Sequence, residues 1–131
     1  MNIVVTGSSG RIGRAIHIRL SRQYRVAGFD SAPSSTSAWV GDLDDGALLA
    51  RAMQGADAVV HTAALHAPHV PHVAAARFRQ VNVAGTRRVL DAASAAGVRR
   101  IVFTSTTALY GSAASPSDGA AWVDETLPPQ P

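Results

Sequence analysis

The sequence predicts an α/β fold in which helices cover both faces of a parallel sheet. Short β-branched segments alternate along the chain with segments whose apolar residues recur at helical spacing. The first β-branched segment runs straight into a turn with three glycines spaced three residues apart. The 131 residues, 47% hydrophobic and 16% charged, suffice for one globular domain spanning residues 1–131. Strands that alternate with helices form right-handed crossovers, which predicts three layers, α/β/α.

The expected elements follow one another in regular order. Strands are expected at residues 2–6, 24–30, 39–40, 57–62 and 100–105, and helices at 11–22, after a capping Asp44, and at 73–96 with Gly97 as its stop. Residues 31–37 read as a loop, and no periodic element is expected beyond Gly111. The apolar segments 58–60 and 101–103 indicate strands buried on both faces. The expected strand order is 3-2-1-4-5, with a ligand at the carboxyl edge of strands one and four.

The glycine turn predicts a phosphate-binding site between the first strand and the first helix. Gly7 permits a tight turn, Gly10 lets the backbone approach a pyrophosphate, and Gly13 lets the helix pack close to the strand. The helix N-terminus adds unpaired N–H groups and a positive dipole end. This arrangement is typical of a Rossmann-type, doubly wound dinucleotide-binding domain. The cofactor contacts expected here come from Gly7, Ser9, Gly10, Arg11, Ile12 and Gly13.

Two aspartates that follow strands are candidates for the adenosine end of a dinucleotide. Asp30 ends the second strand, seventeen residues after Gly13, where a carboxylate can accept both ribose hydroxyls and would repel a 2′-phosphate. We therefore expect NAD rather than NADP. The alternative for Asp30 is that it is an ordinary strand-end aspartate in a turn. Asp42 follows the third strand and can accept from the adenine amino group. Helix capping is its alternative, but Asp44 suits that role better.

Composition argues against several classes of function. The net charge is +3, and all twelve basic residues are arginines scattered along the chain. Only 5% of residues are aromatic, so a nucleic-acid groove is not expected. No apolar run is long enough to span a membrane. The absence of a recognisable signal and of cysteine favours a cytoplasmic location without disulfide chemistry.

Further motifs accompany the glycine turn in chain order. They are Thr6-Gly7-x-x-Gly10-x-x-Gly13, Asp30, Gly41-Asp42-Leu43, His61-Thr62-Ala63-Ala64, Asn82-Val83-x-Gly85-Thr86 and Ser105-Thr106-x-x-Leu109-Tyr110-Gly111. Together they resemble the extended short-chain dehydrogenases, the NAD-dependent epimerase/dehydratase family, over essentially the whole chain. The resemblance implies NAD as cofactor and hydride transfer to and from nicotinamide. It implies an oxidoreductase, epimerase or dehydratase that acts on a sugar, a nucleotide-sugar or a similar small molecule.

The resemblance also implies roles for individual residues. Ala63 and Ala64 line the cofactor, and Leu43 follows Asp42 in the same cofactor-binding motif. Asn82, counted with the cofactor-binding residues, lies on the long helix behind the active site. Thr106 is the catalytic candidate that polarises the substrate's reacting oxygen, because a hydroxyl can donate to a developing oxyanion. Read without the family, Thr106 also fits a polar strand end that bonds its own backbone.

One part of the family pattern is missing from this chain. The family moves its proton with a tyrosine whose pKa is lowered by a lysine four residues later. The residue four after Tyr110 is Ala114, and the chain contains no lysine. The acidic and proline-rich segment 124–131 matches the part of the family that comes before this tyrosine. We therefore expect a truncated, N-terminal part of the pattern that is inactive alone. The alternative is a non-catalytic NAD sensor or regulatory module.

Two further features leave alternatives open. An unpaired edge on the fifth strand would favour either a homo-oligomer or pairing with a further segment. His66, His69 and His72 are evenly spaced, but Pro68 and Pro71 argue against a helix that would gather them on a metal. A solvated loop is the preferred interpretation, followed by contact with substrate, and no metal site is predicted. His61 is interpreted as a strand-end residue near the cofactor.

Overall fold

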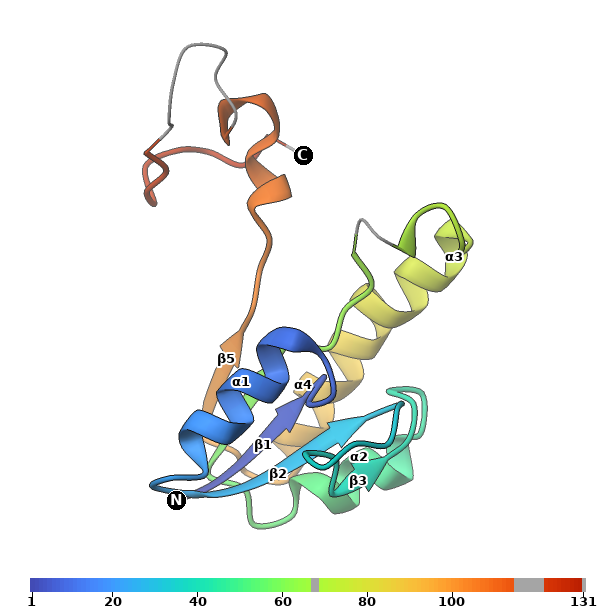
Figure 1. The fold of residues 1–131 in the computed structure, drawn as a ribbon, viewed down its shortest axis with the longest axis vertical. Coiled ribbons are helices and arrows are strands. Elements are labelled where there is room, and N and C mark those ends of the chain that lie inside the picture. Colours follow the sequence, from blue (N-terminus) through green and yellow to red (C-terminus); the bar gives the residue numbers. More distant parts are fainter. Residues whose placement is uncertain (67–68, 115–121, 131) are drawn as a thin grey trace.

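A five-stranded parallel sheet in the order β3-β2-β1-β4-β5 forms the centre of the molecule (Figure 1). The computed structural model describes residues 1–66, 69–114 and 122–130. Its strands are β1 (Asn2–Thr6), β2 (Arg25–Asp30), β3 (Trp39–Val40), β4 (Ala58–His61) and β5 (Arg100–Phe103). All four strand pairs are parallel. The predicted fold class and strand order are therefore confirmed, although β4 and β5 are shorter than predicted.

The helices follow the strands in the alternation that the sequence predicts. They are α1 (Arg11–Leu20), α2 (Gly46–Met53), α3 (Ala75–Phe78), the π-helix η2 (Arg79–Gly85), α4 (Thr86–Ala95) and the 3₁₀ segment η3 (Thr107–Ala114). The consecutive elements α3, η2 and α4 together replace the single helix predicted over 73–96. Segment η3 lies partly beyond Gly111, where no element was expected, and residues 115–121 of that prediction lie outside the described residues.

Two apolar clusters fix the helices on opposite faces of the sheet. On one face, Val4, Phe29 and Val59 pack with residues of α2 and α4, among them Leu49 and Val89. On the other face, side chains of β1 and β4 pack against α1; these are Ile3, Val5, Ala58 and Val60 with Ile16 and Leu20. Neighbours along β1 thus point to opposite faces, as expected for a strand covered on both sides. The carboxyl ends of β1, β2 and β4 meet at one edge of this sheet.

The prediction that β5 is buried on both faces was wrong. Ile101, Val102 and Phe103 are 39%, 57% and 56% exposed, whereas their β4 neighbours Val59 and Val60 are 0% and 8% exposed. The reason is position: β5 is the edge strand, and within the described residues it is paired only with β4. An apolar segment indicates a buried strand only where neighbouring elements cover both of its faces.

The helix cap assigned to Asp44 was also wrong. Helix α2 begins at Gly46, so Asp45 is its N-cap, and the Asp45 carboxylate accepts the N–H of Leu48 at 2.9 Å. A side chain caps the N–H three residues after it, which places Asp44 one residue too early. The Asp44 carboxylate instead binds the Arg88 guanidinium at 2.5 Å.

No helix in the described ranges is long and apolar enough to cross a membrane.

Candidate functional site

Two of the loop glycines stand where the backbone leaves no room for a side chain. Gly7 adopts a φ of +74°, and its N–H donates to the Phe29 carbonyl at 2.8 Å. A Cβ atom on Gly7 would lie 2.6 Å from the backbone nitrogen of Ala63. A Cβ atom on Gly13 would overlap the Gly7 carbonyl and lie 2.7 Å from Thr62 Oγ1. Both glycines therefore bring α1 and the end of β4 close to the turn.

The third glycine faces open space. Gly10 is exposed, and a Cβ atom there would meet only the Gly7 carbonyl oxygen, at 3.3 Å. Gly10 is the N-cap of α1, and no side chain of the described residues caps this helix. Arg11 and Ile12, the first two helical residues, are exposed as well. A free helix N-terminus beside an uncovered backbone is suited to binding an anion such as a phosphate.

Asp30 lies beside this turn and is held there by backbone donors. One carboxylate oxygen accepts the Ser9 N–H at 2.8 Å, and the other accepts the Ala32 N–H at 2.9 Å. A carboxylate oxygen can accept more than one hydrogen bond, so each keeps capacity for a ligand hydroxyl. These two bonds fix the carboxylate at the carboxyl end of β2, next to the N-terminus of α1.

The loop after Asp30 is fastened to the glycine turn through hydroxyl groups. The Ser9 hydroxyl donates to the Ala32 carbonyl at 2.7 Å and lies 3.0 Å from the Ser37 hydroxyl. The buried Thr36 hydroxyl donates to the Ser8 carbonyl at 2.7 Å. Residues 31–38 include no arginine or lysine that could pair with a 2′-phosphate. These serine and threonine contacts were not foreseen, because hydroxyl-rich loops carry no periodic signal.

Asp42 is paired with an arginine that the sequence analysis did not connect to it. The Arg77 guanidinium forms an ion pair with Asp42, and the Asp44 N–H donates to the same carboxylate at 3.1 Å. Burial opposes ionisation of Asp42, but these donors outweigh it and hold the pKa of Asp42 below its ordinary value. Leu43, beside it, is buried in the cluster that faces α4.

The loop after β4 is held from both ends. The Thr62 hydroxyl donates to the Thr6 carbonyl at 2.7 Å. Further along, the Asn82 side chain accepts the Leu65 N–H and donates to the Leu65 carbonyl, both at 2.8 Å. Ala63 packs against the core next to the glycine turn, and Ala64 is exposed. Asn82 therefore acts on this loop through both of its amide atoms.

His61 is almost completely buried, at 1% exposed, at the end of β4. Its ring nitrogens lie 2.5 Å from the Thr6 hydroxyl and 2.9 Å from the Thr86 hydroxyl. The ring stacks on Phe103, with 5.7 Å between centroids. Burial lowers the pKa of His61 to about 4, so the ring is neutral at neutral pH. A histidine that ends an otherwise apolar strand was the one sequence signal of this environment.

Thr106 lies elsewhere in the molecule. It is exposed, and its hydroxyl oxygen accepts the Ala108 N–H at 3.2 Å. Together with three neighbours it lines a cavity of about 260 Å³; these are Ser105, Thr107 and Tyr110. Figure 1 shows η3, which follows Thr106, beyond the carboxyl edge of the sheet and apart from α1. The structure thus gathers the glycine turn, Asp30 and Ala63 but leaves Thr106 at a separate place.

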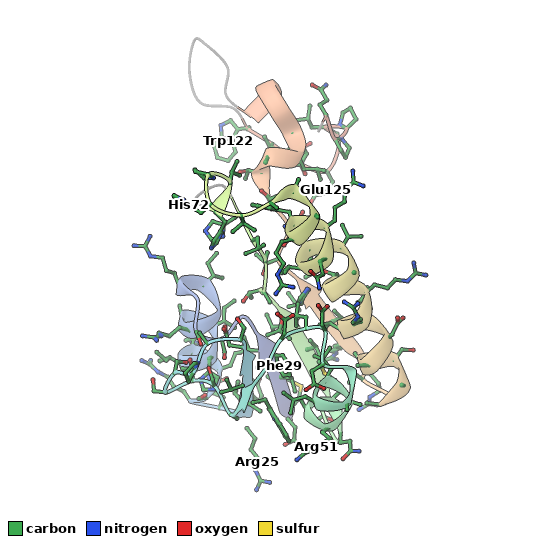
Figure 2. The ribbon with its side chains drawn as sticks, turned by 90° about the vertical axis from the view of Figure 1, so that its right-hand side faces the viewer. Arg25, Phe29, Arg51, His72, Trp122 and Glu125 are labelled. Atoms are coloured by element: carbon green, nitrogen blue, oxygen red, sulfur yellow. The ribbon has the colours of Figure 1, made fainter. Side chains whose placement is uncertain are left out.

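His66, His69 and His72 lie in the segment before α3, and Figure 2 labels His72 there. The His66 N–H donates to the His69 ring at 3.0 Å, and the two rings meet edge to face. His72 is exposed. Pro68, which entered the sequence argument, lies outside the described residues. In the parts of the chain that the structure describes, no three histidine, aspartate or glutamate side chains gather as metal ligands.

The chain is similar to a known protein family and to individual members of it. The model of the NAD dependent epimerase/dehydratase family matches residues 3–131. A 3-beta-hydroxysteroid dehydrogenase of Mycolicibacterium neoaurum is 34% identical over 96% of this chain and 36% of its own length. The chain therefore spans about a third of that relative.

Solved structures agree with the sequence relatives. A short-chain dehydrogenase/reductase superfamily protein of Agrobacterium tumefaciens with bound NAD is 47% identical, with a TM-score of 0.75 over 86% of this chain and 35% of that chain. The UDP-glucose 4-epimerase of Thermus thermophilus in complex with NAD is 30% identical, with a TM-score of 0.83 over 100% of this chain and 45% of that chain. The protein MoeE5 in complex with UDP-glucose and NAD is 29% identical, with a TM-score of 0.82 over 100% and 43%.

Proposed function

The chain belongs to the NAD-dependent epimerase/dehydratase family, and we propose that it forms the NAD-binding part of such an enzyme. In this proposal residues 1–131 act as a single domain. The pyrophosphate binds over Gly10 and the first turn of α1, at Arg11 and Ile12. The adenosine ribose donates to Asp30 beside Ser9, and the adenine lies toward Asp42. The remaining cofactor-binding residues of the proposal are Gly7, Gly13, Leu43, Ala63, Ala64 and Asn82.

One observation supports this assignment most strongly. The Asp30 carboxylate is held by two N–H donors directly beside an uncapped helix N-terminus. An acceptor for ribose hydroxyls thus lies next to a set of donors for phosphates. The ribose and the pyrophosphate are likewise neighbours in a dinucleotide. The same carboxylate repels a 2′-phosphate, and residues 31–38 offer no cation to compensate it. The site therefore favours NAD over NADP.

The activity that we propose for the whole protein is taken from the family. Bound NAD would supply the acceptor for a hydride from a carbinol carbon, and the hydroxyl proton would have to pass to a base. Thr106 is the residue of this chain that we propose donates to the reacting oxygen. The printed sequence has no lysine, so the Tyr–Lys pair of the family is not supplied by these residues. We expect the 131-residue chain to bind NAD but to show no dehydrogenase turnover.

The proposed substrate is a small molecule that carries a hydroxyl or carbonyl group, a sugar or nucleotide-sugar in the first instance. Structural neighbours in complex with UDP-glucose or with formylated UDP-arabinopyranose support this class. A second candidate function, an NAD sensor or regulatory module, is favoured by the missing lysine alone. Catalysis by the chain together with a complementary segment would exclude the sensor. A cytoplasmic location remains a prediction from the sequence.

Titration calorimetry with the purified chain tests the cofactor assignment. We expect micromolar binding of NAD and binding of NADP that is weaker by roughly tenfold or more. Replacement Asp30→Ala should weaken NAD binding by roughly tenfold or more, because the ribose loses its acceptor. Asp91→Ala removes an exposed carboxylate of α4 and serves as the matched control. Equal NAD affinity in the Asp30→Ala and Asp91→Ala variants would contradict the proposal.

A further inference from the structure

A series of hydrogen-bonded polar groups, two of them buried and two half-buried, links the sheet to the loop at the proposed cofactor site. Thr6 of β1 and His61 of β4 are 0% and 1% exposed and lie side by side in the sheet. The Thr6 hydroxyl contacts His61 Nδ1, and His61 Nε2 contacts the Thr86 hydroxyl. The Thr86 hydroxyl also lies 2.7 Å from the carbonyl oxygen of Asn82. These contacts cross from the sheet to the helix that covers it.

For a neutral ring, one placement of the protons satisfies all of these contacts. The Asn82 carbonyl can only accept, so the single hydrogen of the Thr86 hydroxyl points to it. The Thr86 oxygen must then accept from His61, which places the ring proton on Nε2. Nδ1 is left as an acceptor and takes the hydrogen of the Thr6 hydroxyl. Every hydrogen bond in this series therefore has a defined direction, from Thr6 to Asn82.

Asn82, the last residue in this series of hydrogen bonds, is bonded to the loop. Asn82 lies in the π-helix η2, and its side chain holds the backbone of Leu65 through two hydrogen bonds. The same loop carries Ala63, whose backbone nitrogen approaches Gly7. The Thr86 hydroxyl donates to the Asn82 carbonyl, four residues earlier, and so ties the first residue of α4 to η2. The loop is thus linked to Thr6 at its start, through Thr62, and to Thr86 at its far end, through Asn82.

We propose that His61 is a positioning residue of the cofactor site: through Thr86 it holds Asn82, and Asn82 holds loop 62–65 against the glycine turn. This inference rests on the proposed function, because it gives the loop its purpose in binding NAD. It assigns His61 no contact with the cofactor. The buried members of this network, Thr6 and His61, favour one arrangement, because either of them would be costly to leave unpaired.

The pair of variants Thr86→Val and Thr86→Ser tests this inference in the 131-residue chain. Valine keeps the shape of threonine but removes the hydroxyl, whereas serine keeps the hydroxyl. We expect Thr86→Val to weaken NAD binding roughly tenfold, an effect of the size of one hydrogen bond. Amide exchange of Leu65 should accelerate roughly tenfold, with exchange of Val4 and Val5 in β1 unchanged. Thr86→Ser should restore both values to those of the wild type.

A merely structural role would change exchange in β1 together with that of Leu65, whereas a positioning role changes Leu65 alone. The nitrogen chemical shifts of the His61 ring report the direction of the hydrogen bonds. In the wild type we expect a neutral ring with the proton on Nε2; a proton on Nδ1 would overturn the inference. Wild-type Leu65 exchange and NAD affinity in Thr86→Val would overturn it as well. If Thr86→Val loses protection in β1, Thr6→Val with its Thr6→Ser control repeats the test from the other end. If the wild type does not bind NAD, the proposed function fails, while Leu65 exchange and the ring proton still decide the hydrogen-bond chain.

Discussion

Two regions of the sheet's carboxyl edge differ in how completely they are built. At the glycine turn, which follows the central strand, β1 is buried between helices, and Gly7, Gly13 and Asp30 are fixed by backbone contacts. At the edge strand, β5 is exposed along its whole length, and the chain continues into η3, which stands apart from α1 (Figure 1). The proposed cofactor groups lie in the first region and the proposed catalytic Thr106 in the second. Binding and catalysis therefore depend on regions with very different internal support.

This difference has a physical origin. The glycine turn makes its contacts with neighbours close in sequence or in adjacent strands, such as the 2.8 Å bond from Gly7 to Phe29. Thr106 has its bonded partners, Ala108 and Leu109, only two and three residues away. A local bond of this kind fixes a turn but not the position of that turn relative to the sheet. Affinity for NAD should accordingly be robust, and catalytic geometry at Thr106 should not.

The largest expected effect concerns the packed region around the glycine turn. Gly13→Val would force a side chain into the Gly7 carbonyl, so we expect a loss of more than about 4 kcal/mol in the free energy of unfolding. Gly46→Val is the control, because a Cβ atom on Gly46 meets nothing within 4 Å. That variant should lie within about 0.5 kcal/mol of the wild type. Urea unfolding measures both, and similar losses in the two variants would show that α1 does not need its close approach.

The next effect is a pH dependence at the junction of the two regions. His61 has its pKa lowered to about 4 in the folded chain by burial, from an ordinary value of 6.5. The unfolded chain therefore binds a proton first as the pH falls, and stability that is complete above 6.5 is lost between 6.5 and 4. The loss is on the order of 3 kcal/mol.

Urea unfolding at pH 7, 5.5 and 4 checks this dependence against His61→Gln, which cannot titrate. The difference between the two pH profiles isolates His61 from other groups such as His17, whose pKa is also lowered by burial. We expect the wild type to lose more stability than the variant over this interval. Parallel profiles would show that burial of His61 does not depress its pKa.

A smaller effect compares the same substitution on neighbouring strands. Val59→Ala, in β4, removes two methyl groups from a fully buried side chain and should cost about 2 kcal/mol. Val102→Ala, in β5, affects a side chain that is 57% exposed and should cost less than about 0.5 kcal/mol. Thermal unfolding of the two variants gives the comparison. A large loss for Val102→Ala would mean that β5 is covered in solution, for example by a second copy of the chain.

The sequence was a good guide wherever the signal was local and periodic. The alternation of helices and strands and the place of the glycine turn followed from spacing, and the strand order followed from the fold class that they indicate. The errors at Asp44 and β5 have different causes. Asp44 and Asp45 are equally good caps, and the first turn of the helix decides between them. Burial of β5 depends on elements in space that its own residues do not specify.

The candidate site was predictable in its backbone and less so in its side-chain partners. Glycines signal close approach through their type and spacing alone. The pairing of Arg77 with Asp42 joins residues 35 positions apart, and no local pattern connects them. Likewise, no local pattern in the sequence connects Thr86 with His61, although the two side chains are in contact. Interactions between distant residues require the three-dimensional arrangement.

The most direct test of the account is an NMR titration of the ¹⁵N-labelled chain with NAD. We predict saturable shifts of the amides of Gly7, Ser9, Gly10, Ala32 and Ala63. The amides of Leu109 and Gln130, which lie together beyond β5, should stay unchanged. Shifts confined to the segment beyond β5, with none at the glycine turn, would contradict the claim that the packed region around β1 binds the cofactor.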